Sequence, residues 1–410
     1  MYTLPILIIA IIAAIYMSWN IGANDVANSM GTSVGSGALT LTKAVIVAGV
    51  FEFLGAFFVG KHVTTTISKG IVNPVSIEPH LLMLGMLSAL IAAALWVTIA
   101  TYFGLPVSTT HSIVGGVMGF AMILDNRLIL WHKLIGIIGS WIISPVSGAL
   151  ISYLIFLTIK KTILSKTDPI KEAKKVIPFF IFFTTFIISM SIIYKGLKNI
   201  GLNLCFKYSL LFSIIPAGIG MFIGHILLSR YKYEYTDEED KYNKLENIFI
   251  YLQIITACSV AFAHGANDVA NSTGPLVTIV ELYKGKSVSS KIIIPLWVLA
   301  LGGFGIVLGI STWGYKVIHT IGEKITEVTP TRGFSAELAT AFTVLVFSKL
   351  GMPISTSHVI VGSVLGVGIA GGFATVNYKI IKNIIYSWIL TIPVALLFSS
   401  GIFILLRIIF

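Results

Sequence analysis

The sequence predicts an all-α polytopic membrane protein with about 12 membrane segments, arranged as two inverted repeats with broken or re-entrant helices. Hydrophobic residues make up 56% of the 410 residues and charged residues only 11%, whereas a typical soluble domain has about 25% charged residues. Apolar runs close to the roughly 20 residues that cross a bilayer recur from Leu4 to Phe410. Two motifs also occur twice, in the same order.

The charge of the chain fits membrane insertion better than nucleic-acid binding. The formal net charge is +11, but the lysines lie between apolar segments, as the positive-inside rule predicts. We therefore expect the lipid bilayer, and no nucleic acid, as a partner. Cys205 and Cys258 show neither metal-site nor disulfide spacing, and we interpret both as packing residues.

The apolar segments fall into two sets around a central pair. The first set is Tyr2–Ile21, Ala44–Val59, Leu81–Phe103, Val107–Leu124 and Leu134–Ile159. The central pair is Val176–Tyr194 and Phe206–Leu228, followed by a charged stretch from Arg230 to Asn247. The second set is Ile248–Ala263, Val269–Leu282, Ile292–Ile310, Leu338–Leu350, Ile354–Phe373 and Ile380–Phe410. Several segments are short or interrupted by Gly and Pro, which indicates helices that do not cross the membrane completely.

The second set repeats the first. The eight residues GANDVANS occur at Gly22–Ser29 and again at Gly265–Ser272, and the segment PVSTTH at Pro106–His111 matches PISTSH at Pro353–His358. Motif order and spacing agree between the halves. The chain therefore divides into a first repeat (residues 1–160), a linker with two extra transmembrane spans (161–247) and a second repeat (248–410).

The lysine distribution predicts the orientation. Residues 160–175 contain six lysines, and residues 230–247 add further basic side chains, so we expect both stretches in the cytoplasm. No Lys or Arg precedes Lys43, which favours an extracellular or periplasmic N-terminus. Two spans between the basic stretches then invert the second repeat relative to the first. We expect a multi-pass protein of the cell (inner) membrane with both termini outside.

Four acidic side chains lie within apolar segments or at their ends: Asp25, Glu52, Asp268 and Glu337. A carboxylate at the bilayer centre costs about 2.5 to 3.5 kcal/mol on insertion scales. Asp25 and Asp268 belong to the duplicated motif, together with Asn24, Asn28, Asn267 and Asn271. Carboxylate, amide and backbone carbonyl oxygens are ligands of hard cations such as Na⁺, and Gly and Asn favour a helix break that frees carbonyls. These side chains could instead only bind neighbouring helices, but their duplication favours an ion site at the repeat interface.

Two hydroxyl-rich segments open helices in matching positions. The first contains Ser108, Thr109, Thr110 and Ser112, and the second contains Ser355, Thr356 and Ser357. Free backbone N–H groups and the helix dipole attract anions to helix N-termini. Plain helix capping explains a single Ser or Thr, but two matched clusters at membrane depth favour an oxyanion site.

Other polar residues leave alternatives open. Glu52 and Glu337 have no acidic counterpart in the opposite half, so each could be a cation ligand, a proton carrier or a structural partner. His111 and His358 follow the hydroxyl segments, and we interpret them as structural histidines rather than a proton relay. His264 precedes the second GANDVANS motif where the first has Ile21, so it cannot serve both copies.

These motifs together resemble those of the inorganic phosphate transporter family. The resemblance covers nearly the whole chain and also includes FEFLGA at Phe51–Ala56 and GFSAELA at Gly333–Ala339. It implies inverted repeats, extracellular termini and secondary transport of inorganic phosphate driven by a Na⁺ or H⁺ gradient. The family's functional residues correspond to Asp25, Asn28, Asp268, Asn271, Ser108, Ser355, Glu52 and Glu337. Ser112 departs from the internal symmetry, because its counterpart is Val359. The short central linker indicates a prokaryotic member.

We therefore expect a Na⁺-coupled phosphate symporter that works by alternating access, with no cofactor besides the coupling ion. Phosphate is assigned to the hydroxyl-rich segments with Asn28 and Asn271, and Na⁺ to Asp25, Asp268, Asn24, Asn267, Glu52 and Glu337. The alternatives are H⁺-coupled phosphate transport and a permease for sulfate or another oxyanion. An enzyme is not expected, because the duplicated clusters are symmetric whereas catalysis needs one nucleophile and one base. The expected assembly is a homodimer.

Overall fold

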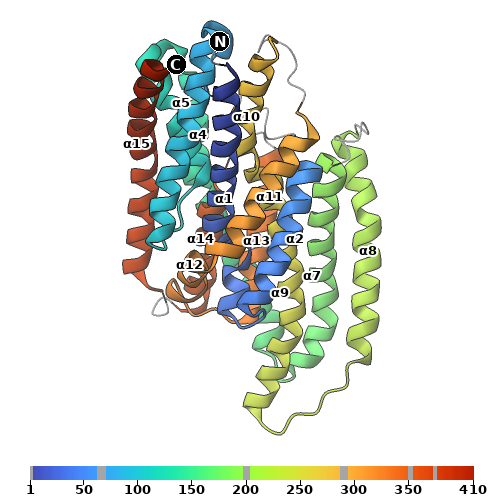
Figure 1. Ribbon diagram of the computed structural model, residues 1–410. Coiled ribbons are helices and arrows are strands. Elements are labelled where there is room, and N and C mark those ends of the chain that lie inside the picture. The colour runs from blue at the N-terminus through green and yellow to red at the C-terminus, as the bar shows by residue number, and fades with distance from the viewer. Residues whose placement is uncertain (1–2, 62–70, 197–203, 287–293, 350–353, 373–375) are drawn as a thin grey trace.

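The protein is a bundle of long helices (Figure 1). The computed structural model describes residues 3–61, 71–196, 204–286, 294–349, 354–372 and 376–410. Within these ranges no strand is present, and the only extended pairing is an isolated bridge between Val72 and Ile129. The predicted segment ends at Tyr2, Ile292, Leu350 and Phe373, and Pro353 of the second hydroxyl-rich segment, lie outside the described residues.

The helices follow the apolar segments of the sequence. The first half contains α1 (Thr3–Gly35), α2 (Leu41–Val59), α4 (Pro79–Tyr102), α5 (Thr109–Leu124) and α6 (Trp131–Ile159), with short turns η1 (Pro74–Ser76) and η2 (Asn126–Leu128). Next come η3 (Lys160–Leu164), α7 (Pro169–Ser191), η4 (Ile192–Gly196) and α8 (Phe206–Arg230). The second half contains α9 (Glu238–Asp268), α10 (Ala270–Tyr283), α11 (Leu296–Trp313), α12 (Tyr315–His319), η6 (Thr320–Lys324), α13 (Pro330–Lys349), α14 (Thr356–Gly371) and α15 (Tyr378–Ile409).

The lengths of these helices confirm the predicted polytopic membrane fold. Among the described residues, nine helical stretches are long and apolar enough to cross a membrane. Helices α5 and α14 are apolar but have only 16 residues each, or about 24 Å at 1.5 Å per residue. This is less than the roughly 30 Å of the hydrocarbon core, so neither helix is long enough to cross it.

The two halves interlock with matching contacts. Helix α1 packs against α11 and α2 packs against α9; likewise α5 packs against α15 and α14 packs against α6. In Figure 1, α1 descends from the upper end whereas α9 rises from the lower end, and both chain ends lie at the upper end. Equivalent helices therefore run in opposite directions, as expected for an inverted repeat, and α7 and α8 lie at one side.

Glycines bring the interlocked helices into backbone contact. A Cβ atom on Gly22 would lie 1.9 Å from the Ile306 carbonyl oxygen, and one on Gly265 would lie 2.0 Å from the Glu52 carbonyl oxygen. In the other direction, a Cβ on Gly309 would lie 1.9 Å from the Trp19 carbonyl oxygen. Close approach of this kind is typical of small residues at helix interfaces in membranes. These glycine contacts fix the position of both GANDVANS motifs along the helices of the opposite half.

The expected helix break occurs in only one copy of the motif. Helix α1 continues through Gly22–Ser29 without interruption, whereas α9 ends at Asp268 and α10 begins at Ala270. The sequence difference nearest this interruption is Pro275, whose position in the first half is Thr32. Proline lacks an N–H donor and its ring clashes with the carbonyl four residues earlier, which here belongs to Asn271, in the first turn after Val269. The prediction of a break was therefore wrong for the first motif.

The backbone contact at Gly309 gives a test of the packing. Gly309→Ala should lower the stability of the protein by about 1 to 3 kcal/mol, because the methyl group forces α1 and α11 apart. Gly136→Ala is the matched control, since Gly136 is an exposed helical glycine with no atom within 4 Å of an added Cβ. It should be neutral or stabilising by up to about 1 kcal/mol. Thermal unfolding in detergent measures both, and equal midpoints for the two variants would contradict the packing described.

Candidate functional site

The hydroxyl-rich segments form the N-termini of α5 and α14. Ser108 caps α5, and its hydroxyl oxygen accepts a hydrogen bond of 3.1 Å from the His111 backbone N–H. Ser355 caps α14 in the same way, accepting from the His358 N–H at 3.3 Å. Both serines have the extended backbone of an N-cap residue. The local structure is thus repeated in the two halves.

Asp25 on α1 joins the two helix starts. The Thr109 hydroxyl donates to its Oδ2 atom at 2.6 Å, and the Ser357 hydroxyl donates to its Oδ1 atom at 3.0 Å. Asp268 at the end of α9 is the counterpart, and its Oδ2 atom accepts a hydrogen bond of 2.9 Å from Thr356. All of these side chains are buried, so the structure brings both acids and both hydroxyl-rich segments into one site.

The asparagines at the end of each motif cross to the opposite half. Asn28 on α1 donates from Nδ2 to the Ser357 hydroxyl at 2.9 Å. Asn271 on α10 donates from Nδ2 to the hydroxyls of Thr109 and Thr110, both at 3.2 Å. The Asn28 Oδ1 atom is buried and has no hydrogen-bond partner among the described residues. Each half of the molecule thus supplies an amide to the helix start of the other half.

The asparagines that precede the acids have different partners. Asn24 faces the turn between α4 and α5, donating to the Thr101 hydroxyl at 2.8 Å and accepting from the Val107 N–H at 3.1 Å. Asn267 instead donates to its neighbour Asp268 at 2.7 Å. The amide of Asn24 therefore braces the chain just before the first hydroxyl-rich segment. Ser112, also predicted as an anion ligand, donates back to the Ser108 carbonyl within its own helix.

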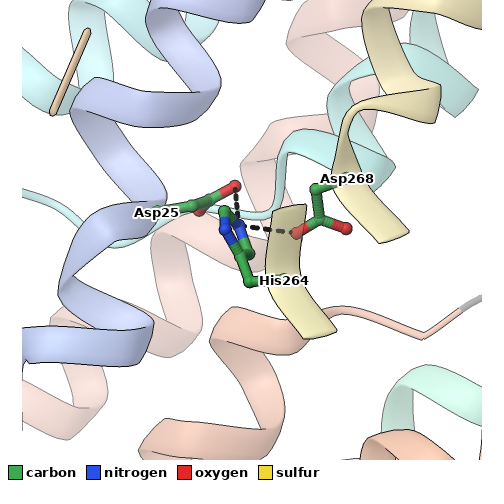
Figure 2. Close-up of side chains that lie close together, drawn as sticks. All are labelled: Asp25, His264 and Asp268. Atoms are coloured by element: carbon green, nitrogen blue, oxygen red, sulfur yellow. Dashed lines mark ion pairs between the residues drawn. The ribbon is translucent and has the colours of Figure 1, made fainter. Parts of the chain in front are cut away.

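His264 lies between the two aspartates (Figure 2). Its Nε2 atom is 2.8 Å from Asp268 Oδ2 and 3.7 Å from Asp25 Oδ2. Its Nδ1 atom is 2.9 Å from Oε2 of Glu52 on α2, whose Oε1 atom accepts a hydrogen bond of 3.1 Å from Ser29. All four ionisable side chains are buried. One ligand atom from each of Asp25, His264 and Asp268 lies within 4.8 Å of the others, a spacing that could hold a metal ion.

Sequence reasoning did not predict this position for His264, because the first motif has Ile21 there. The glycine contacts show that Glu52 is equivalent to Ile306, since each supplies the carbonyl against a motif glycine. The polar pair Glu52 and His264 thus corresponds to the buried apolar pair Ile306 and Ile21. The sequence does contain a signal for this pair, because both residues depart from the internal symmetry. His264 stands where the first half has Ile21, and Glu52 stands where the second half has Ile306. His264 also precedes Asp268 by four residues, which places both on one helix face.

Glu337 lies in a separate cluster. Its Oε1 atom accepts hydrogen bonds from Thr32 at 2.6 Å, Ser33 at 2.8 Å and Gln253 at 3.3 Å, and its Oε2 atom accepts from Thr256 at 2.6 Å. Thr32 is seven residues beyond Asp25, or about 10 Å along α1. The predicted cation ligands therefore form two groups, one around Asp25 and Asp268 and one around Glu337.

Comparisons with known proteins agree with one another. The family model described as "Phosphate transporter family" matches residues 21–399. A protein of Pyrococcus furiosus named "Putative phosphate permease" is 46% identical over 402 residues, covering 97% of this chain and 96% of that protein. A protein of the same name from Haemophilus influenzae is 43% identical over 399 residues, covering 96% and 95%. A solved structure described as "The sodium-dependent phosphate transporter" has a TM-score of 0.91 and 44% identity, covering 99% of this chain and all of that one.

Proposed function

The chain belongs to the phosphate transporter family, and we propose that it carries inorganic phosphate together with Na⁺ by alternating access. The observation that supports this best is the exchange of hydrogen bonds between halves. Asp25 and Asn28 of the first half bind Ser357 of the second, and Asn271 of the second half binds Thr109 of the first. A site built equally from two oppositely directed repeats can be opened from either side.

The anion would bind between the starts of α5 and α14. Thr109, Thr110, Thr356 and Ser357 supply hydroxyl donors there, and the two helix N-termini add the positive ends of their dipoles. Asn28 and Asn271 contribute amide donors. Such a site has no lysine or arginine among these groups, which suits an anion that has to leave again.

The hydroxyl groups supply a reason for coupling. A Ser or Thr hydroxyl has one hydrogen to donate. The hydrogens of Thr109 and Thr356 are directed at the carboxylates of Asp25 and Asp268, and that of Ser357 is shared between Asp25 Oδ1 and the Val107 carbonyl oxygen. A cation on those carboxylates competes for the same oxygen lone pairs and offsets their charge. The hydroxyl hydrogens then become available to phosphate, so cation binding and anion binding favour each other.

The donor set around Asp25 and Asp268 suits a hard cation. Carboxylate oxygens of both acids lie close together on the Nε2 side of His264, and Glu52 adds a third carboxylate on the Nδ1 side of the same ring. The similar solved structure is that of a transporter described as sodium-dependent, which supports Na⁺ as the ion here. His264 contacts three of the acids and would keep them in position around the ion.

Glu337 would provide a second cation position. Its carboxylate is surrounded by oxygen-bearing side chains from α1 and α9, namely Thr32, Ser33 and Thr256 with Gln253. Helices α1 and α9 also carry Asp25 and Asp268, so an ion at Glu337 would act on the same two helices as the first. The two positions would then respond together to the cation gradient.

The orientation follows from the basic connections. The lysine-rich residues 160–175 and the start of α9 lie at the lower end of Figure 1, opposite the chain ends. We assign the lower end to the cytoplasm and the cell membrane as the location.

The main test of the proposed function uses purified protein in proteoliposomes. An inward Na⁺ gradient should drive phosphate uptake by the wild-type protein, and Asp25→Asn should abolish it, because the neutral amide no longer attracts the cation. Asp125→Asn is the control, since Asp125 is partly exposed and pairs with Arg127 at 2.9 Å outside the site. Its uptake should stay within about twofold of wild type, as expected for an exposed ion pair worth about 1 kcal/mol or less.

Two further arms of this assay decide between the alternatives. Uptake driven by an H⁺ gradient and not by Na⁺ would assign the acids to proton transfer. Efficient competition by sulfate would replace phosphate with a broader oxyanion specificity. Normal gradient-driven uptake by the Asp25→Asn variant would remove Asp25 from the cation site.

Glu337→Gln tests the second cation position. The half-saturating Na⁺ concentration should rise roughly tenfold, the effect of losing about 1.4 kcal/mol of binding, and the Hill coefficient for Na⁺ should fall by about one. Glu281→Gln is the control, because Glu281 is also buried but pairs with Lys286 at 2.9 Å. A Glu337→Gln variant that is folded and has unchanged Na⁺ dependence would leave Glu337 with a structural role alone.

The orientation can be checked by labelling. In protein whose native Cys205 and Cys258 are replaced by Ser, a cysteine placed at exposed Lys171 should react with a membrane-impermeant thiol reagent only after cells are permeabilised. A cysteine at exposed Leu4 should react in intact cells. The opposite pattern would reverse the assignment.

A further inference from the structure

Four aromatic rings lie in a row directly behind the hydroxyl-rich segments. The ring centroid of Trp141 on α6 is 3.7 Å from that of His111 on α5, which is 4.5 Å from that of His358 on α14. The row ends at Trp388 on α15, whose ring is 3.7 Å from His358. Two rings come from each half of the molecule, so the contact between the histidines joins the halves.

Hydrogen bonds tie this row to the backbone of the opposite half. Trp388 donates from Nε1 to the Pro106 carbonyl oxygen at 3.1 Å, two residues before the cap of α5. The His358 Nδ1 atom is 3.4 Å from the Trp141 carbonyl oxygen. Trp388 of the second half thus holds the chain that leads into the first hydroxyl-rich segment. His358, also of the second half, contacts the backbone of Trp141 in the first half.

The two histidines are also part of the helix caps. The backbone N–H groups of His111 and His358 are the donors that Ser108 and Ser355 accept. Each ring is therefore carried by the N-terminal turn that also carries the hydroxyl groups. The spacing between the two rings is linked in this way to the spacing between the two helix starts.

The interpretation of these residues as fully satisfied structural histidines does not account for their nitrogen atoms. The Nε2 atoms of both rings are buried and have no hydrogen-bond partner among the described residues. A buried polar atom left unpaired opposes folding, so residues selected for packing alone would be apolar here. The unpaired Nε2 atoms therefore lower the stability of the fold, and packing alone does not explain why histidines occupy these two positions.

We propose that Trp141, His111, His358 and Trp388 form a ring clamp, a set of positioning residues that holds the two hydroxyl-rich helix starts at the separation required by the bound anion. The inference rests on the proposed function, since it concerns phosphate held between α5 and α14. The rings come from the two hydroxyl-bearing helices and from α6 and α15, the partners against which these pack. The clamp is thus expected to act on the anion, because its hydrogen bonds go to the backbone of Pro106 and Trp141 and not to Asp25 or Asp268.

The experiment compares two Trp→Phe substitutions that each remove one N–H to carbonyl hydrogen bond. Trp388→Phe keeps a ring beside His358 but frees the Pro106 carbonyl. Trp131→Phe is the control, because Trp131 is 47% exposed and its Nε1 atom donates to the Asn126 carbonyl at 3.2 Å away from the site. In proteoliposomes, Trp388→Phe should raise the KM for phosphate about tenfold, equivalent to about 1.4 kcal/mol, with a change in maximal rate below about twofold. Trp131→Phe should match wild type.

Thermal unfolding in detergent supplies the second readout. With Trp388→Phe, the stabilisation by Na⁺ alone should be retained, whereas stabilisation by phosphate should need about tenfold more phosphate. His111→Ala removes a ring without removing a side-chain hydrogen bond and should give the same separation if Trp388→Phe does not fold. Equal loss of the Na⁺ and phosphate responses would show a merely structural role. A variant KM equal to that of the control would also overturn the clamp, and absence of any phosphate response in folded wild-type protein would overturn the proposed function and the clamp together.

Discussion

The structure depends on the pairing of buried carboxylates with hydroxyl groups that belong to helix starts. Asp25 and Asp268 lie deep in an apolar bundle, where an unpaired charge is costly. Their partners, Thr109, Thr356 and Ser357, are held in place by the caps of α5 and α14. The carboxylates therefore fix the relative position of the two halves, and the glycine contacts at Gly22 and Gly265 set the depth at which this happens.

The same pairing connects stability with transport. In a protein that binds no ligand, hydrogen bonds from hydroxyl groups to carboxylates would only stabilise the fold. Here those donors lie at two converging helix N-termini, and Asn28 and Asn271 reach the same hydroxyls from opposite halves. On the proposed function, a cation on the carboxylates would release these donors in the place where an anion is most favoured. The contacts that stabilise the bundle here would then be exchanged for ligands.

Much of this arrangement was predictable from the sequence, and the limits have physical reasons. Duplication of GANDVANS and of the hydroxyl-rich segments indicated the helical repeats, which the fold confirms, and the spacing of the motifs suggested that they meet. The partner of each side chain was not predictable, because crossing between halves depends on helix packing that has no local signature. Asn24 and Asn28 have the same chemistry, yet one braces a turn and the other reaches the opposite half. His264 was not predicted as a site residue because the first motif has Ile21 at the equivalent position. Its partner Glu52 also differs from its equivalent in the other half, Ile306.

That broken symmetry has a consequence for the empty protein. In an ideal inverted repeat, the arrangement open to one side and the arrangement open to the other are equivalent by rotation and have equal free energy. Here the α2–α9 contact contains the ionisable pair Glu52 and His264, whereas the α1–α11 contact has isoleucines at the same positions. Separating ionisable groups and separating hydrocarbon side chains have different solvation free energies. On the proposed function, the unloaded carrier would therefore prefer one side, and the Glu52 and His264 pair would contribute to that preference.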